Sequence, residues 1–80
     1  LPILLGEGFG FHEILCPPSL EGTTLKESGI GQRTGLTVIA VETGDGLLTD
    51  PGPRTVLSPG NTLLAIGSQE QALAFRETFT

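Results

Sequence analysis

Cysteine is almost absent from this 80-residue chain, whose only thiol is Cys16. A single cysteine excludes an internal disulfide and a zinc site made of four thiolates. His12 is the only histidine, so any Cys–His nucleophile pair would have to join these two residues. On a predicted strand they lie roughly 13 Å apart, beyond hydrogen-bond reach. We therefore expect a chain that is not an enzyme, and one that suits a reducing compartment.

Basic residues are scarce as well: four Lys and Arg against nine Asp and Glu give a formal net charge of −5. A nucleic-acid partner requires a basic surface to displace counterions from phosphates, so we expect no nucleic-acid binding. The longest apolar runs, residues 3–5 and 38–41, are far shorter than the roughly 18 residues of a membrane span. The first residues also lack the basic segment that is typical of a signal peptide.

Glycine and proline are plentiful, with 12 and 6 residues respectively, so we expect short elements joined by many turns. The apolar share of 38% supports one small core. The chain begins with Leu1 rather than Met, and residues 1–8 are interpreted as a linker or the tail of a preceding element. The domain itself is predicted to span residues 9–80, as part of a longer protein.

Apolar patterns and turn residues predict a small α+β domain with the order β-α-β-β-β-α. Strands are expected at 9–16, which Pro17-Pro18 ends, and at 36–42, 47–49 and 62–67. A short helix of about two turns is expected to begin at a Thr23 or Thr24 cap and to end at Gly29. The last helix follows a capping box at Ser68–Gln71. Its Ala72, Phe75 and Phe79, with Leu73 beside them, are predicted to pack on the sheet.

Two clusters of residues raise the question of a ligand. Residues 6–10 are rich in glycine but are followed by a predicted strand, whereas a dinucleotide-binding loop leads into a helix. The acids Glu42, Asp45 and Asp50 flank the predicted hairpin at 43–46 and suit a hard cation such as calcium. Ordinary solvated turn chemistry is the favoured interpretation of these acids, and both remain open.

The stretch from Ser19 to Phe79 resembles a known family in several short motifs that occur in order. These are Leu20-Glu21-Gly22-Thr23-Thr24-Leu25, Gly35-Leu36-Thr37-Val38-Ile39-Ala40-Val41, Asp50-Pro51-Gly52-Pro53, Val56-Leu57-Ser58-Pro59-Gly60-Asn61-Thr62-Leu63-Leu64, and Ile66-Gly67-Ser68 before the last helix. Together they resemble the TrkA-C domain, the C-terminal lobe of RCK domains (regulators of potassium conductance).

This resemblance implies a cytosolic regulatory and dimerisation module of a potassium channel or potassium/cation transport protein. Such lobes form homodimers and accompany a Rossmann-type nucleotide-binding lobe or a potassium-transporting membrane protein, at the cytoplasmic side of the membrane. Some members bind cyclic di-AMP at or near the dimer interface and others bind calcium. The alternative is a purely structural oligomerisation lobe without a ligand, as in a cation/proton antiporter or the loop of an anion transporter.

Carried over onto this sequence, the cyclic di-AMP site would involve Ile30, Gly31, Thr37, Val38 and Pro51. The sequence departs from the family pattern at the position whose positive charge would contact a phosphate of the ligand. Gly31 stands where cyclic di-AMP binders have a basic residue, and Thr37-Val38 replace their Asn-Ile pair. Arg33 follows two residues later and is the cation expected to reach a phosphate. For calcium, the acids Glu7, Glu13, Glu42, Asp45 and Asp50 are candidates only because oxygen donors suit the ion.

Overall fold

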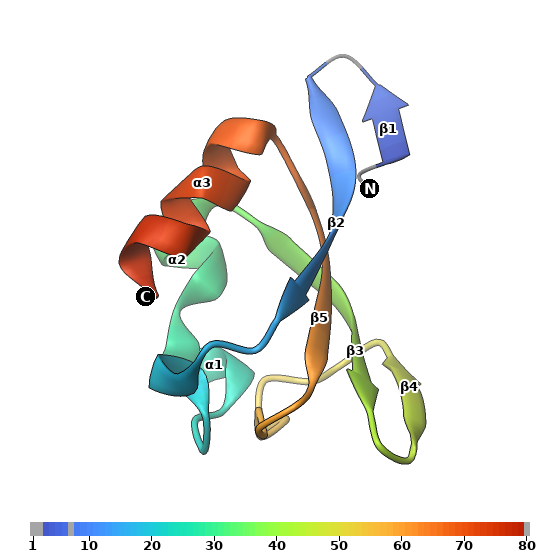
Figure 1. The fold of residues 1–80 in the computed structure, drawn as a ribbon, viewed down its shortest axis with the longest axis vertical. Coiled ribbons are helices and arrows are strands. Elements are labelled where there is room, and N and C mark those ends of the chain that lie inside the picture. The colour runs from blue at the N-terminus through green and yellow to red at the C-terminus, as the bar shows by residue number, and fades with distance from the viewer. Residues whose placement is uncertain (1–2, 7, 80) are drawn as a thin grey trace.

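An antiparallel sheet forms one layer of the molecule, and its helices cover one face of that sheet (Figure 1). The computed structural model describes residues 3–6 and 8–79. Within these residues the sheet has five strands in the order β1-β2-β5-β3-β4. The strands are β1 (Ile3–Gly6), β2 (Phe9–Leu15), β3 (Thr37–Thr43), β4 (Gly46–Thr49) and β5 (Thr62–Gly67). The helices are η1 (Pro18–Leu20, a 3₁₀ turn), α1 (Leu25–Ser28), α2 (Ile30–Thr34) and α3 (Gln69–Thr78). The predicted α+β class is confirmed.

The central strand β5 pairs antiparallel with β2 on one side and with β3 on the other. Its alternate residues Leu63, Ala65 and Gly67 are buried, and those between them are half-buried. This alternation is expected for a sheet with one covered and one open face. Ile66 belongs to the open face, so it contributes less to the core than a continuous apolar strand would suggest.

The core lies between the sheet and the helices. Val41 of β3 and Leu63 of β5 face each other in the register and have no exposed surface (0% each). The buried cluster around them contains Cys16, Leu20, Ile30, Leu36, Leu57, Ala65, Phe75 and Phe79. No helix in the described part of the chain is long and apolar enough to cross a membrane.

Residues 1–8 were predicted to be a linker or the tail of a preceding element, and part of this segment is a strand. Ile3–Gly6 form β1, an edge strand that pairs antiparallel with β2 through the partners Leu4 and Gly10. Residues 1–2 and 7 lie outside the described residues. The sequence signal was weak because this strand is only four residues long, too short for a period-2 alternation to be recognised.

The segment after Thr24 also differs from the prediction of one helix. Here α1 is a single turn that ends at Gly29, whose φ of 65° lies in the left-handed region. Gly29 is at the same time the N-cap of α2, which ends at Gly35 with a φ of 85°. Because α2 has no side-chain cap at its N-terminus, it lacks the signal from which a helix start is recognised in a sequence.

Leu73 does not pack on the sheet as predicted, since 56% of its surface is exposed. Successive residues of an α-helix are about 100° apart, so Leu73 points roughly 200° away from Phe75. Phe75 and Phe79 face the core as predicted, with ring centroids 4.9 Å apart. The prediction was therefore right for the two aromatic residues and wrong for Leu73.

The two faces of β5 predict different costs for neighbouring substitutions. Leu63→Ala removes a fully buried side chain and should lower the free energy of unfolding by about 2–5 kcal/mol. Leu64→Ala, on the half-buried open face, is the matched control and should cost about 1–2 kcal/mol. Urea unfolding followed by circular dichroism measures both, and equal costs would contradict the assignment of the faces.

Candidate functional site

A surface depression of about 420 Å³ lies where α1 and α2 meet the loop that follows β4. Its lining is mostly apolar or glycine, with one charged residue, Lys26. The lining consists of Leu25, Lys26, Gly29, Ile30, Gly31, Gln32, Pro51, Gly52 and Pro53. We call this depression the α1–α2 pocket.

Backbone hydrogen bonds hold the loop against the start of α1. The amide of Leu25 donates to the carbonyl of Thr55 at 2.9 Å, and the amide of Lys26 donates to that of Pro53 at 3.0 Å. These are N-terminal amides that a helix cannot satisfy internally. A β-bridge between Thr24 and Val56 adds to this attachment. The loop prolines therefore form a fixed wall of the pocket.

A capping box fixes the first turn of α1. The Glu27 amide donates to the Thr24 hydroxyl oxygen at 3.1 Å, and the Glu27 carboxylate accepts from the Thr24 amide at 2.9 Å. The Thr24 hydroxyl also donates to this carboxylate at 3.0 Å. Both hydrogen bonds to the carboxylate lower the pKa of Glu27. The bond from the Thr24 amide has the larger effect, and the bond from the Thr24 hydroxyl has the smaller one. They stabilise the carboxylate form of Glu27. The neighbouring Lys26 takes no part in the capping box and is exposed at the pocket.

Three of the residues that the family resemblance assigns to a ligand line the pocket together. Ile30 and Gly31 come from α2, and Pro51 comes from the loop. Thr37 and Val38 begin β3 and are not among the lining residues. Thr37 is exposed, whereas Val38 packs against the core. The pocket thus unites the helix and loop parts of the expected set but not its strand part.

Arg33 is not among the residues that line the pocket. Its guanidinium carbon lies 4.7 Å from the centroid of the Phe79 ring, a cation–π arrangement. Lys26 lines the pocket instead. Sequence reasoning missed Lys26, although a signal was present: it is the second residue of a helix whose cap was predicted at Thr24. Its approach to Pro53 is a tertiary contact that no local pattern contains.

The acids proposed for a metal do not form a site in the described residues. Glu42 lies in β3, Asp45 lies in the hairpin turn, and Asp50 follows β4. Among residues 3–6 and 8–79, no group of three or more His, Cys, Asp or Glu side chains is placed to hold a metal ion. Glu13 belongs to the exposed face of β2, and Glu7 lies outside the described residues. The Thr43 hydroxyl, rather than an acid, holds the hairpin turn, since it accepts from the amide of Asp45 at 3.1 Å.

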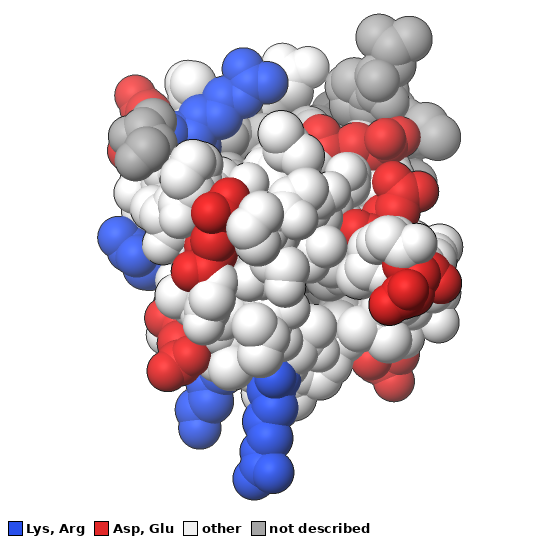
Figure 2. All heavy atoms as spheres, turned by 60° about the horizontal axis from the view of Figure 1, so that its bottom comes forward, with Lys and Arg blue, Asp and Glu red and all other residues white. Residues whose placement is uncertain are grey.

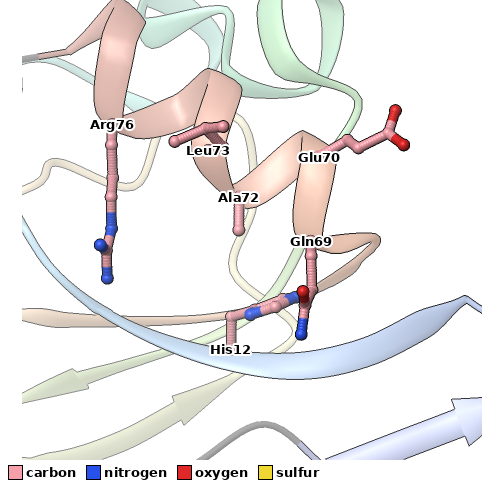
Figure 3. A pocket seen from close by; sticks show the side chains of 6 residues that line it. All are labelled: His12, Gln69, Glu70, Ala72, Leu73 and Arg76. Atoms are coloured by element: carbon pink, nitrogen blue, oxygen red, sulfur yellow. The ribbon is translucent and has the colours of Figure 1, made fainter.

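A second depression, of about 530 Å³, lies between β2 and α3 (Figure 3). His12 and Gln69 lie side by side at its base, and Nε2 of His12 is 3.1 Å from the carbonyl oxygen of Gly67. Ala72 and Arg76 project from α3 toward β2, and Glu70 projects away. Leu73 completes the lining. This depression contains none of the residues predicted for a ligand.

Cys16 is not a reactive thiol. It is buried in the core, and burial, together with the nearby charge of Glu21, raises its pKa. A raised pKa lowers the fraction of thiolate, which is the nucleophilic form. On the face shown in Figure 2, basic side chains lie next to each other at the bottom of the view, and those at the left and the top lie apart from them.

The fold, the pocket and the motifs define a small domain of the RCK type. The family model for the TrkA-C domain matches residues 12–80, and the chain belongs to this family. The family is a regulatory and non-enzymatic one, in agreement with the prediction from the sequence.

Three relatives illustrate the similarity. Potassium channel protein 1 of Methanocaldococcus jannaschii is 44% identical over 52 residues, which are 65% of this chain and 16% of that protein. The RCK domain of the GsuK channel is 33% identical, with a TM-score of 0.81 over 91% of this chain and 16% of that one. The chain therefore spans about a sixth of the length of each.

The third relative is the RCK_C domain dimer of Streptococcus agalactiae BusR, solved in complex with c-di-AMP. It is 22% identical, with a TM-score of 0.79 over 90% of this chain and 91% of that one. At this identity the likeness is one of fold.

The capping box predicts a dependence of stability on pH. Because the folded-state pKa of Glu27 is lowered, its contribution to stability is present above the unfolded-state pKa and is lost as the pH falls through the folded-state pKa. Glu27→Gln keeps a capping side chain but removes the titration. At pH 7 the native chain should be more stable than the variant, and this difference should disappear below the ordinary range of a glutamate. A difference that is constant from pH 7 to acid, measured by urea unfolding, would contradict this assignment.

Proposed function

We propose that the chain is the regulatory and dimerisation lobe of a potassium channel or transport protein, with a small anionic ligand bound at the α1–α2 pocket. The observation that carries the proposal is the meeting of Ile30, Gly31 and Pro51 with Lys26 around one depression. Three of these residues match the ligand positions of the family, and Lys26 supplies a cation that Gly31 cannot supply.

Cyclic di-AMP suits this arrangement in symmetry and charge. The ligand has a two-fold axis and two phosphates, and a symmetric dimer with the pocket near its axis offers one Lys26 from each copy. The partly exposed apolar side chains of Leu25 and Pro51 suit the faces of adenine rings, whereas the Ile30 side chain is buried in the core. BusR, which shares the fold, binds this ligand as a dimer of the same domain. The net charge of −5 weakens anion binding, so the two lysines carry most of the attraction.

In the parent protein we place this lobe on the cytoplasmic side of the membrane, next to a Rossmann-type nucleotide-binding lobe or a potassium-transporting membrane part. The similarity to the RCK domain of GsuK and to Potassium channel protein 1 supports this placement. A ligand that binds one arrangement of the dimer more tightly shifts the population toward it. That shift is what the lobe would transmit to the transport pathway.

A structural lobe without a ligand is the second proposal. The observation that favours it is Gly31. This exposed residue has no side chain, whereas cyclic di-AMP binders of the family have a basic residue at this position. Calcium is the least supported ligand, because the described acids form no cluster.

The position of Lys26 makes the ligand proposal testable. Lys26→Gln should weaken the binding of cyclic di-AMP by about 10- to 100-fold, since a charge-assisted contact to phosphate contributes about 1.5–3 kcal/mol. Arg33→Gln is the matched control and should leave the affinity unchanged, because Arg33 contacts Phe79 rather than the pocket. Isothermal titration calorimetry measures both variants. Absence of binding by the native chain would favour the structural lobe, and loss of binding in the Arg33 variant alone would overturn the assignment of Lys26.

The dimer is a separate prediction. We expect the isolated domain to sediment as a homodimer at high micromolar concentration, because an 80-residue chain has little core of its own and leaves an apolar sheet face half-buried. Sedimentation velocity measures the mass in solution. A monomer throughout this range would count against the dimerisation role whatever the outcome with the ligand.

A further inference from the structure

The loop that follows β4 contains a basic residue, Arg54, that is not among the lining residues of the α1–α2 pocket. The amide of Thr55 donates to the carbonyl of Gly52 at 3.1 Å, so residues 52–55 form a β-turn. Arg54 is one of the two central residues of this turn, and it is exposed. Its charge is therefore in contact with solvent, one residue from Pro53, which does line the pocket.

The first turn of α1 lies directly against this β-turn. The amide of Lys26 donates to the carbonyl of Pro53 at 3.0 Å, and the amide of Leu25 donates to that of Thr55 at 2.9 Å. These carbonyls belong to the residues on either side of Arg54, so the backbones of Lys26 and Arg54 are neighbours in space. Both side chains are long and exposed, and Figure 2 shows basic side chains next to each other at the bottom of the view.

The meeting of two basic residues is unexpected in this acidic chain. It has four Lys and Arg against nine Asp and Glu, and two of those four are brought together here. Like charges at close range repel each other. The acid next to Lys26 in the sequence is Glu27, whose Oε1 atom accepts from both the amide and the hydroxyl of Thr24. An anion held between Lys26 and Arg54 would replace their repulsion by two attractive contacts.

We propose that Arg54 is a second cation of the α1–α2 pocket and that it holds, together with Lys26, one phosphate group of the ligand. This inference rests on the proposed function, because it assigns a further residue to the same site. A guanidinium binds phosphate through two parallel hydrogen bonds, whereas an ammonium acts as a point charge. The pair would thus fix the orientation of the phosphate as well as balance its charge. In a symmetric dimer each copy supplies one such pair, which matches the two phosphates of cyclic di-AMP.

Removal of the guanidinium tests the assignment. Arg54→Gln should weaken the binding of cyclic di-AMP by about 10- to 100-fold, because one charge-assisted contact is lost in each copy. Arg54→Lys keeps the charge without the parallel hydrogen bonds and should lose only about threefold. Isothermal titration calorimetry measures both variants, and circular dichroism checks that each is folded. Arg54 lies in an exposed turn, so neither change removes a buried contact.

Charge reversal tests the closeness of the two cations. Arg54→Glu places a carboxylate beside Lys26, which would then pair with the lysine in place of the phosphate. This variant should therefore bind at least about tenfold more weakly than Arg54→Gln. Arg76→Glu is the matched control, since it changes the net charge by the same amount on α3, at the depression between β2 and α3. It should leave the affinity within about threefold of the native value.

Failure of this inference can be told from failure of the proposed function. If Lys26→Gln weakens the binding of cyclic di-AMP and Arg54→Gln does not, Arg54 is no part of the site and the proposed function stands. Equal effects of Arg54→Glu and Arg76→Glu would also overturn the inference, because they would show only a dependence on net charge.

Absence of cyclic di-AMP binding by the native chain would reject that ligand, and inorganic pyrophosphate then tests the pair of cations alone. At constant ionic strength, pyrophosphate should raise the midpoint of thermal unfolding of the native chain, since it binds the folded state. The increase should fall by about half or more in Arg54→Gln and in Lys26→Gln, and it should persist in Arg76→Gln. No increase in the native chain, or an equal increase in all four proteins, would overturn the inference.

Discussion

The helices depend on a decrease in side-chain size along the covered face of β5. Leu63, Ala65 and Gly67 follow one another on this face, and all three are buried. A Cβ at Gly67 would collide with the side chain of Leu36 and lie 2.6 Å from Oε1 of Gln71. The start of α3 can therefore approach the sheet only because position 67 has no side chain. The same Gln71 oxygen accepts from the Ser68 amide at 2.9 Å, so the cap of α3 and its packing share one requirement.

The position of the α1–α2 pocket follows from a second set of contacts, at the other end of the core. The amide of Gly22 donates to the carbonyl of Leu57 at 2.7 Å, and the amide of Leu57 donates to that of Thr23 at 2.8 Å. Leu57 itself is fully buried. This anchor fixes the chain just after the loop prolines, and it helps to hold residues 51 to 53 beside a helix that lies about 25 residues earlier in the sequence.

Local signals were sufficient for most of the fold. The strands around Val41 and Leu63 and the caps at Thr24 and Ser68 follow from apolar runs and from hydrogen bonds between near neighbours. What the sequence did not reveal depends on distant partners. The strand β1 is defined by its pairing with β2, and α2 continues from the glycine that ends α1.

The residues of the candidate site also fall into those that the sequence predicted and those that depend on distant partners. Ile30, Gly31 and Pro51 were predicted because motifs of the family occur in the sequence, and the fold brings them together. Arg33 was predicted as the cation because it lies close to Ile30 along the chain, and it does not line the pocket. The direction of that side chain is set by the ring of Phe79, at the far end of the sequence. The contact of Lys26 with the loop that contains Pro53, which places this lysine in the lining of the pocket, is visible only in the tertiary structure.

The hairpin at the outer edge of the sheet has a bearing on solubility. Leu47 and Leu48 are both exposed on the edge strand β4, whose outer hydrogen-bonding groups have no neighbouring strand among residues 3–6 and 8–79. Such a strand is prone to pair with a copy of itself and so to join two sheets edge to edge. The antiparallel register that pairs Leu47 with Leu48 of another molecule also brings Asp45 opposite Asp50. Electrostatic repulsion between these acids at both ends of the strand pair opposes edge-to-edge pairing in this register.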